Sequence, residues 1–264
     1  MVAHAGRVVD DSPSQSQNPG QSQSEHLVDR ALDGAERRLG RAAEHVPQAV
    51  RPKLRGWLHL GAVPLAVVLG TIAVFLAPAG AVRWSVVVYL VTTVLLFGVS
   101  ATYHRRVWGP TWTGVLKRLD HSNIYLFIAG SYTPFAAALL PGPTGRRLLT
   151  VVWVVAALGV VFRVAWVGAP RWLYVGTYLA LGWVAVAYLP DLWDAGGPLI
   201  VLLIAAGGLF YSLGAVVYAM KRPNPSPTWF GFHELFHAFT IAAYLTQYVA
   251  VLLAIGSAAG AVTA

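Results

Sequence analysis

Seven long apolar runs follow one another after residue 56. They lie near 57–77, 82–104, 121–140, 148–167, 172–189, 198–219 and 232–256. Each approaches the roughly 20 residues that a helix needs to cross the hydrocarbon core of a bilayer. The stretches between them, such as "APAG", "PGPTGRR" and "KRPNPSPTW", are rich in Gly, Pro or charge, as loops are. The pattern predicts an all-α membrane protein in which residues 51–264 form seven transmembrane helices.

The first 50 residues have a different pattern. Residues 1–25 are polar and rich in Ser and Gln, a composition typical of a disordered arm. In residues 26–50, apolar positions recur at steps of three and four among several arginines, which predicts a short amphipathic cytoplasmic helix. Such a helix either lies on an anionic membrane surface or packs on the loops of the protein's own transmembrane domain.

Charge is scarce in the apolar part and unevenly placed. Only 11% of the residues are charged and 56% are hydrophobic, and four of the eleven acids lie beyond residue 50. Lys and Arg gather before the first run and in the loops after the second, fourth and sixth, which places the N-terminus in the cytoplasm and the C-terminus outside. This topology accounts for the net charge of +8, and no clustered basic patch indicates nucleic-acid binding. We expect membrane lipids as the partners.

Side chains that suit a metal site lie at the cytoplasmic ends of three runs. Ser100 and His104 close the second, Asp120 opens the third, and His233 and His237 open the last. The last two are four residues apart, so their imidazoles share one helical face, and His104 supplies a third nitrogen. Three such ligands suit tetrahedral zinc and leave one position for a water, whose pKa falls to about 7. Asp120 could accept a proton from that water, and Ser100 could orient a substrate carbonyl.

Several of these residues have a plainer interpretation. Asp120 suits the N-cap of the third helix, and serines such as Ser100 are common where membrane helices pack closely. Two other histidines are interpreted without a metal. His59 is expected to be a packing or interface residue, and His121 to face a neighbouring helix or the interface.

The last run begins with the pattern His-Glu-x-x-His, which zinc proteases also use. In those enzymes the Glu is the general base, and a third metal ligand usually follows downstream. Here no His, Asp or Glu follows His237. Glu234 lies about 100° around the helix from the first histidine. The chain has no cysteine, so the third ligand must be an upstream His or carboxylate, which disfavours a protease.

Three motifs carry a resemblance to a known family: "SATYH", "LDHSNIYLFIAGSYTPF" and "GFHELFHAF". Over about residues 50 to 256 the chain resembles the bacterial hemolysin III branch of the progestin and adipoQ receptor family. The resemblance implies seven helices with the N-terminus inside, in a bacterial plasma membrane. It also implies zinc held by His104, His233 and His237, with Ser100 and Asp120 around the bound water. The wider superfamily includes alkaline ceramidases, which hydrolyse a lipid amide.

These observations favour a zinc-dependent hydrolase that acts on a lipid amide or ester at the cytoplasmic side of the membrane. Two alternatives stay open from the sequence. The protein could be a sensor or regulator of membrane lipids in which zinc is structural, or a pore-forming cytolysin. The pore is disfavoured because the seven apolar runs show no polar stripe along a lumen.

Overall fold

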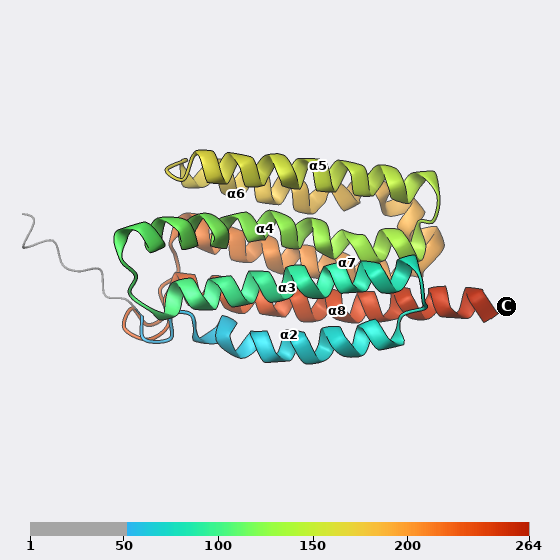
Figure 1. The fold of residues 1–264 in the computed structure, drawn as a ribbon, viewed down its shortest axis with the longest axis horizontal. Coiled ribbons are helices and arrows are strands. Elements are labelled where there is room, and N and C mark those ends of the chain that lie inside the picture. The colour runs from blue at the N-terminus through green and yellow to red at the C-terminus, as the bar shows by residue number, and fades with distance from the viewer. Residues whose placement is uncertain (1–51, 264) are drawn as a thin grey trace, which may run out of the picture. The chain divides into compact units, whose positions relative to one another are not determined.

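A computed structural model describes residues 52–263, and these are helical apart from short loops (Figure 1). The predicted N-terminal arm and amphipathic helix lie outside the described residues. The elements, in chain order, are α2 (Trp57–Leu76), α3 (Ala81–Arg105), α4 (Pro110–Leu139), α5 (Pro143–Ala165), α6 (Arg171–Gly182), the 3-10 helix η1 (Trp183–Tyr188), α7 (Leu189–Met220) and α8 (Phe232–Thr263). The predicted all-α class is confirmed.

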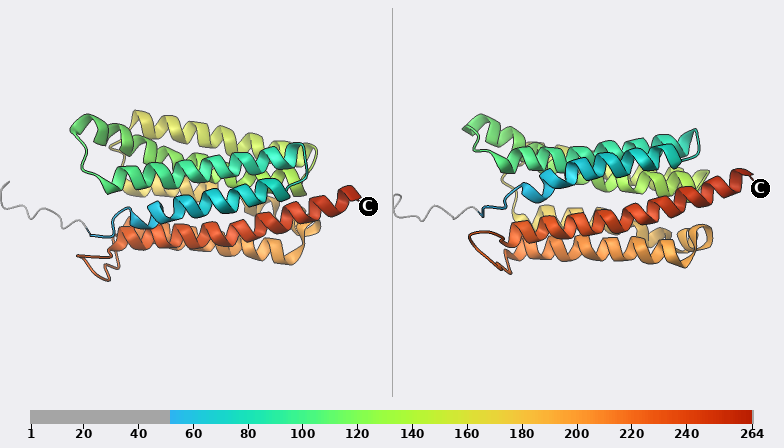
Figure 2. Two further views of the ribbon diagram at one scale, coloured as in Figure 1. Left: turned by 60° about the horizontal axis from the view of Figure 1, so that its bottom comes forward. Right: turned by 90° about the horizontal axis from the view of Figure 1, so that it is seen from below.

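The helices run up and down in one bundle, so that chain-distant segments meet at each end (Figures 1 and 2). Half of the residues in the apolar windows of α3 and α8 are buried, against 28% in α2 and α5. The outer helices leave large apolar side chains uncovered, such as Phe75 and Leu158. An uncovered apolar surface of this kind is what hydrocarbon requires of a membrane protein.

Five helical segments of the described chain are long and apolar enough to cross a membrane. They are α2, α3, α5, the continuous stretch Arg171–Met220 and Phe232–Gly260 of α8. The helix α4 is not among them, and it carries Lys117, Arg118 and Asp120 in its first half. A multi-pass membrane protein is therefore confirmed, while the number of crossings and their orientation stay predictions.

Two stretches that were expected to form loops are helical. The helix α4 begins at Pro110 with Gly109 as its N-cap residue, well before the predicted start at 121. Asp120 therefore lies about three turns inside α4 and does not cap it. Likewise, residues 190–197 were expected to form a loop, yet 190–196 are helical, and a kink at Gly197, where φ is 75°, separates them from the rest of α7.

Two glycines allow close contacts between neighbouring segments of the bundle. At Gly130 of α4, an added Cβ would lie 2.1 Å from the Thr92 hydroxyl of α3, so only glycine allows this contact. At Gly56, just before α2, φ is 79° and an added Cβ would lie 3.0 Å from the Cβ of His104. A side chain at either position would push α3 away from its neighbours.

Candidate metal centre

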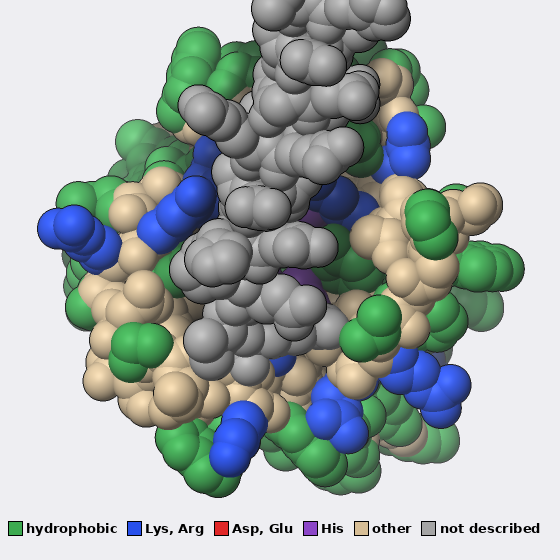
Figure 3. Space-filling model, turned by 90° about the vertical axis from the view of Figure 1, so that its left-hand side faces the viewer, with side chains coloured by type: hydrophobic (Ala, Val, Ile, Leu, Met, Phe, Trp, Pro, Cys, Tyr) green, Lys and Arg blue, Asp and Glu red, His purple; other side chains and the backbone are tan. Residues whose placement is uncertain are grey.

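Basic side chains gather at the end of the bundle where α2, α4, α6 and α8 begin. We call this the basic end. Ten Lys and Arg residues lie there, namely Lys53, Arg55, Arg105, Arg106, Lys117, Arg118, Arg163, Arg171, Lys221 and Arg222. Figure 3 looks onto it, with Lys and Arg side chains around a hollow in which histidine surface is visible. The predicted site residues all belong to helix segments near this end.

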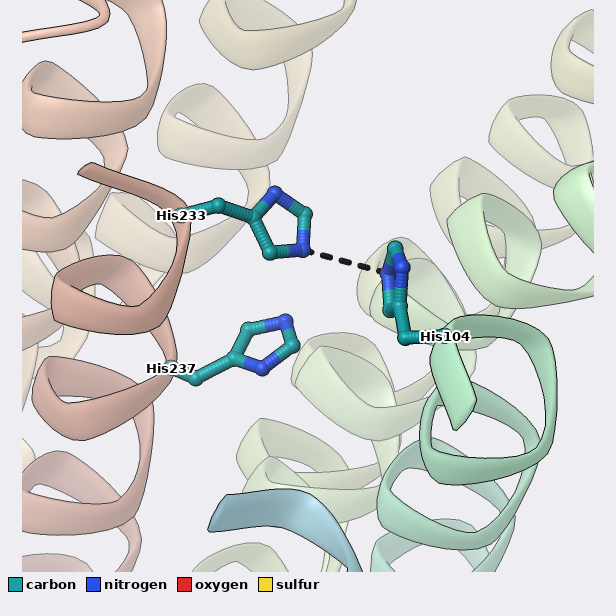
Figure 4. Close-up of side chains that lie close together, drawn as sticks. All are labelled: His104, His233 and His237. Atoms are coloured by element: carbon teal, nitrogen blue, oxygen red, sulfur yellow. Dashed lines mark hydrogen bonds between the residues drawn. The ribbon is translucent and has the colours of Figure 1, made fainter. Parts of the chain in front are cut away.

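The three predicted metal ligands meet at the basic end (Figure 4). His104 is in the last turn of α3, and His233 and His237 occupy the first turns of α8. One ring nitrogen from each lies within 4.8 Å of the others, and all three residues are buried. The Nε2 atoms of His104 and His233 are 3.1 Å apart. Residues more than a hundred positions apart thus converge as the sequence predicted.

This cluster fits a zinc ion by the chemistry of its donors. Three buried imidazoles offer neutral nitrogen ligands, and the spacing within the cluster is short enough for one small ion to bridge them. The Nδ1 atom of His237 has no hydrogen-bond partner among the described residues, although it is buried. In Figure 4 this nitrogen faces away from His104 and His233, and the other ring nitrogen, Nε2, points into the cluster. Three nitrogens with an open position are a donor set that suits zinc.

Asp120 and Ser100 lie beside the three histidines. The Asp120 carboxylate is 3.6 Å from Nε2 of His104, and its side chain is 14% exposed. Ser100 is buried one turn before His104 on α3, and its hydroxyl faces the Asp120 carboxylate. Both side chains line the same cavity as the histidines. The structure therefore brings all five predicted site residues together.

Glu234, the acid of the His-Glu-x-x-His pattern, is held on another face of α8. Its carboxylate accepts a hydrogen bond from Nε of Arg55 at 2.7 Å and another from the backbone N–H of Gly231 at 2.8 Å. The side chain is 1% exposed. Both carboxylate oxygens thus have partners away from the histidine rings. The role of a protease general base does not fit this arrangement.

Sequence reasoning missed Arg55, although one signal pointed to such a partner. Glu234 is a carboxylate at the start of an apolar helix, and a buried charge needs an opposite charge. Two backbone hydrogen bonds, from Lys53 and Leu54 to the loop before α8, hold the segment that carries Arg55. The ion pair and these two hydrogen bonds connect the segment before α2 to the beginning of α8.

The two remaining histidines of the bundle differ in their surroundings. The Nδ1 atom of His121 lies 2.7 Å from the carbonyl oxygen of Lys117 in its own helix, and its ring meets the edge of Tyr174. His121 thus faces neighbours, as predicted. His59 of α2 is buried and stacks on the ring of His237, with 3.6 Å between centroids and 12° between planes. It is a packing residue, as expected, but it packs on a candidate metal ligand.

A cavity of about 430 Å³ leads from the three histidines into the bundle. At the basic end its wall includes Asp120, His121 and Arg171. Its other end reaches Phe135, which lies about four turns further along α4. Between these ends the wall is mainly apolar and aromatic. The cavity therefore offers a polar end and a long apolar end.

Comparison with known proteins agrees with this site. A family model described as "Haemolysin-III related" matches residues 48–248. The chain belongs to this family. The matched range contains the candidate ligands, from His104 to His237, and begins just before the described helices. The resemblance seen in the sequence is thereby confirmed.

Relatives of this haemolysin-III related protein occur in bacteria and in eukaryotes. The hemolysin-3 homolog of Bacillus subtilis (strain 168) is 29% identical over 171 residues, or 64% of this chain and 78% of the relative. Hemolysin-3 of Bacillus cereus is 31% identical over 167 residues, or 62% of this chain and 72% of the relative. The rice protein named heptahelical transmembrane protein ADIPOR2 is 30% identical over 196 residues, or 65% of this chain and 82% of the relative.

Proposed function

We propose that the protein is a zinc-dependent hydrolase of a lipid amide or ester. The observation that carries this proposal is the position of three converging imidazoles at the polar end of a long apolar cavity. An amphiphile with one apolar chain has the matching distribution of polarity. Its chain would lie along α4, and its polar group would lie beside the histidines.

The topology that goes with this function is seven crossings with the basic end in the cytoplasm of a bacterial cell. Seven results when α6 with η1 and α7 are taken as separate crossings and α4 is added to the apolar helices. Ten Lys and Arg residues lie at the basic end, whereas Arg83, Arg146 and Arg147 lie at the other, which supports this orientation. The word heptahelical in the name of the rice relative agrees with the count.

Each residue of the site would have its own chemical role. His104, His233 and His237 would hold the zinc ion. A zinc ion with three nitrogen ligands supplies a water of lowered pKa and polarises a carbonyl. Asp120 would accept a proton at its carboxylate, since it is the one acid that lines the cavity among the described residues. Ser100 would orient the polar group of the substrate from the floor of the site.

The route of the substrate is suggested by the wall of the cavity between η1 and α7. Trp183 and Val186 line the cavity and are also 43% and 49% exposed. The cavity thus reaches the apolar outer surface of the bundle at this point. The Nε1–H of Trp183 donates to the Ser212 hydroxyl at 3.0 Å across the gap. A lipid could enter from the bilayer here without passing through water.

The experiment is release of fatty acid from lipid amides and esters by the full chain, purified in detergent with zinc. We expect turnover by the wild type, and loss of turnover in His233→Ala. Glu234→Gln is the matched control, since it changes the neighbouring residue of the same helix turn and should keep activity. Zinc bound in full with no turnover on any lipid class tested would overturn the hydrolase and favour a lipid sensor with structural zinc.

A further inference from the structure

His59 is a buried imidazole whose ring nitrogens have no partner among the described residues. It lies in the first turn of α2 and is 3% exposed. Neither Nδ1 nor Nε2 makes a hydrogen bond to the part of the chain that the structure describes. A neutral imidazole has one donor and one acceptor, and each polar group left unpaired in a protein interior costs about 1–3 kcal/mol.

Packing alone does not explain a histidine at this position. The His59 ring stacks on His237 and is tilted against Phe97, with 5.0 Å between centroids. Both contacts are made by the faces and edges of an aromatic ring, and phenylalanine would make them as well. Phenylalanine would do so without burying two polar atoms. The nitrogens of His59 therefore need a partner that the described helices do not provide.

Metal binding does not explain His59 either. Its ring is nearly parallel to that of His237, at 12°, and the centroids are 3.6 Å apart. A zinc–nitrogen bond is about 2.0–2.1 Å long and lies near the plane of the ring. Two stacked rings at this separation cannot both direct a nitrogen at one ion. This agrees with the composition of the metal cluster, which includes His237 and not His59.

The remaining partner is a molecule in the cavity. His59 lines the same cavity as the three histidines and Asp120. We infer that His59 is a substrate-binding residue that hydrogen-bonds the polar group of a lipid amide or ester bound beside the three histidines. This inference rests on the proposed function for the class of ligand. It assigns to α2 a direct contact with that ligand.

The test is binding and does not depend on turnover. The probes are oleamide, which has a polar amide on an apolar chain, and the alkene of matched chain length, which has none. Binding of each radiolabelled probe is measured to the full chain in lipid nanodiscs, with empty nanodiscs as blank. Zinc content is determined on the same samples. In His59→Phe we expect oleamide affinity to fall about tenfold, the size of one lost hydrogen bond, and alkene affinity to stay unchanged.

Two further variants separate hydrogen bonding from packing. Phe97→Leu disturbs the packing against His59 and removes no polar group, so the preference for oleamide over the alkene should persist. His59→Gln lacks the ring and keeps a donor and an acceptor, so part of the preference should return. The zinc content of His59→Phe should equal that of the wild type, because the stacking ring is retained.

Each outcome decides between the inference and the proposed function. Equal oleamide affinity in wild type and His59→Phe overturns the role of His59 and leaves the hydrolase standing. Loss of zinc in His59→Phe also overturns it, since His59 would then act on the metal site. If the preference for oleamide over the alkene depends on His59 but the protein hydrolyses no lipid, the role of His59 is supported and the proposed hydrolase activity is overturned. If the wild type does not bind oleamide at all, the role of His59 is overturned, and the turnover assay decides the hydrolase separately.

Discussion

The first turns of α8 have two sides with opposite character. On one side, Glu234 is buried with both carboxylate oxygens engaged, by Arg55 and by the backbone of Gly231. On the other, His233 and His237 point towards His104, and one ring nitrogen from each of the three lies within 4.8 Å of the others. The first side has the features of a structural contact, and the second side has the features of a binding site.

This difference bears on whether the His-Glu-x-x-His pattern indicates a zinc protease. A buried polar group that already has its partners contributes to stability and fixes geometry. Buried imidazole nitrogens that face one another, as in the cluster of His104, His233 and His237, are costly unless a ligand or water occupies the space between them. The motif is therefore used in two parts, with its acid as an anchor for the helix and its histidines as ligands. The two parts should respond differently to perturbation.

Removal of the metal should have the largest effect. A ligand that binds only the folded state at a thousand times its Kd stabilises that state by about 4 kcal/mol. Chelation should therefore lower the thermal stability of the wild type in detergent, and zinc should restore it. In His237→Ala neither step should change the melting temperature. A chelator effect of equal size in His237→Ala would show that the stabilising ion binds elsewhere.

Loss of the ion pair between Arg55 and Glu234 should have the second largest effect. Arg55→Ala leaves the Glu234 carboxylate buried without its cation, which should lower the free energy of unfolding by about 3 kcal/mol. Because the histidine side of α8 is separate, the zinc content at saturating zinc should stay that of the wild type. Denaturation in mixed micelles and elemental analysis measure the two quantities. Loss of zinc together with stability would mean that the two sides of α8 are not independent.

Asp120→Asn should have a smaller effect on the metal. The carboxylate is close enough to Nε2 of His104 to orient that ring, and loss of such a neighbour typically reduces metal affinity about 10- to 100-fold. Competition titration against a zinc chelator measures this shift. Asp191→Asn, in the first turn of α7 at the other end of the bundle, is the matched control and should leave affinity unchanged. An unchanged affinity in Asp120→Asn would remove Asp120 from the site.

Ser100→Ala should have the smallest effect of the series. The hydroxyl faces a carboxylate that also has a histidine neighbour, so its loss should cost roughly 1 kcal/mol or less. The same titration should show less than about a fivefold change in zinc affinity. A change as large as that of Asp120→Asn would place the hydroxyl in direct contact with the metal.

The site could be predicted from the sequence because its geometry depends on few features. The spacing of His233 and His237 puts both on one helical face. The alternation of apolar runs and loops brings the end of α3 to the start of α8. The partners of the ligands could not be predicted in this way. Arg55 and Glu234 are 179 positions apart, and the contact of His59 with His237 depends on which side of a uniformly apolar α2 faces the bundle.

The fold was predicted well except where charge interrupts a helix. Residues 110–120 contain Lys117, Arg118 and Asp120, so a count of apolar residues ends there, while the backbone continues as α4. Its start at Pro110 follows a different rule, since proline is well tolerated in the first turn of a helix. Pro190 also lies at the start of a helix, α7, although the sequence around it was interpreted as a loop. Proline marked helix starts in both cases and was taken for a loop signal at both.

The most direct measurement is the zinc content of the full chain purified in detergent, for the wild type, Glu234→Gln, His104→Ala, His233→Ala and His237→Ala. A cluster of three histidine ligands predicts about one zinc per chain in the wild type and in Glu234→Gln, and far less in each histidine variant. If His104→Ala keeps its zinc while Glu234→Gln loses it, the ion is bound by the other side of α8, and the three histidines are not the metal centre.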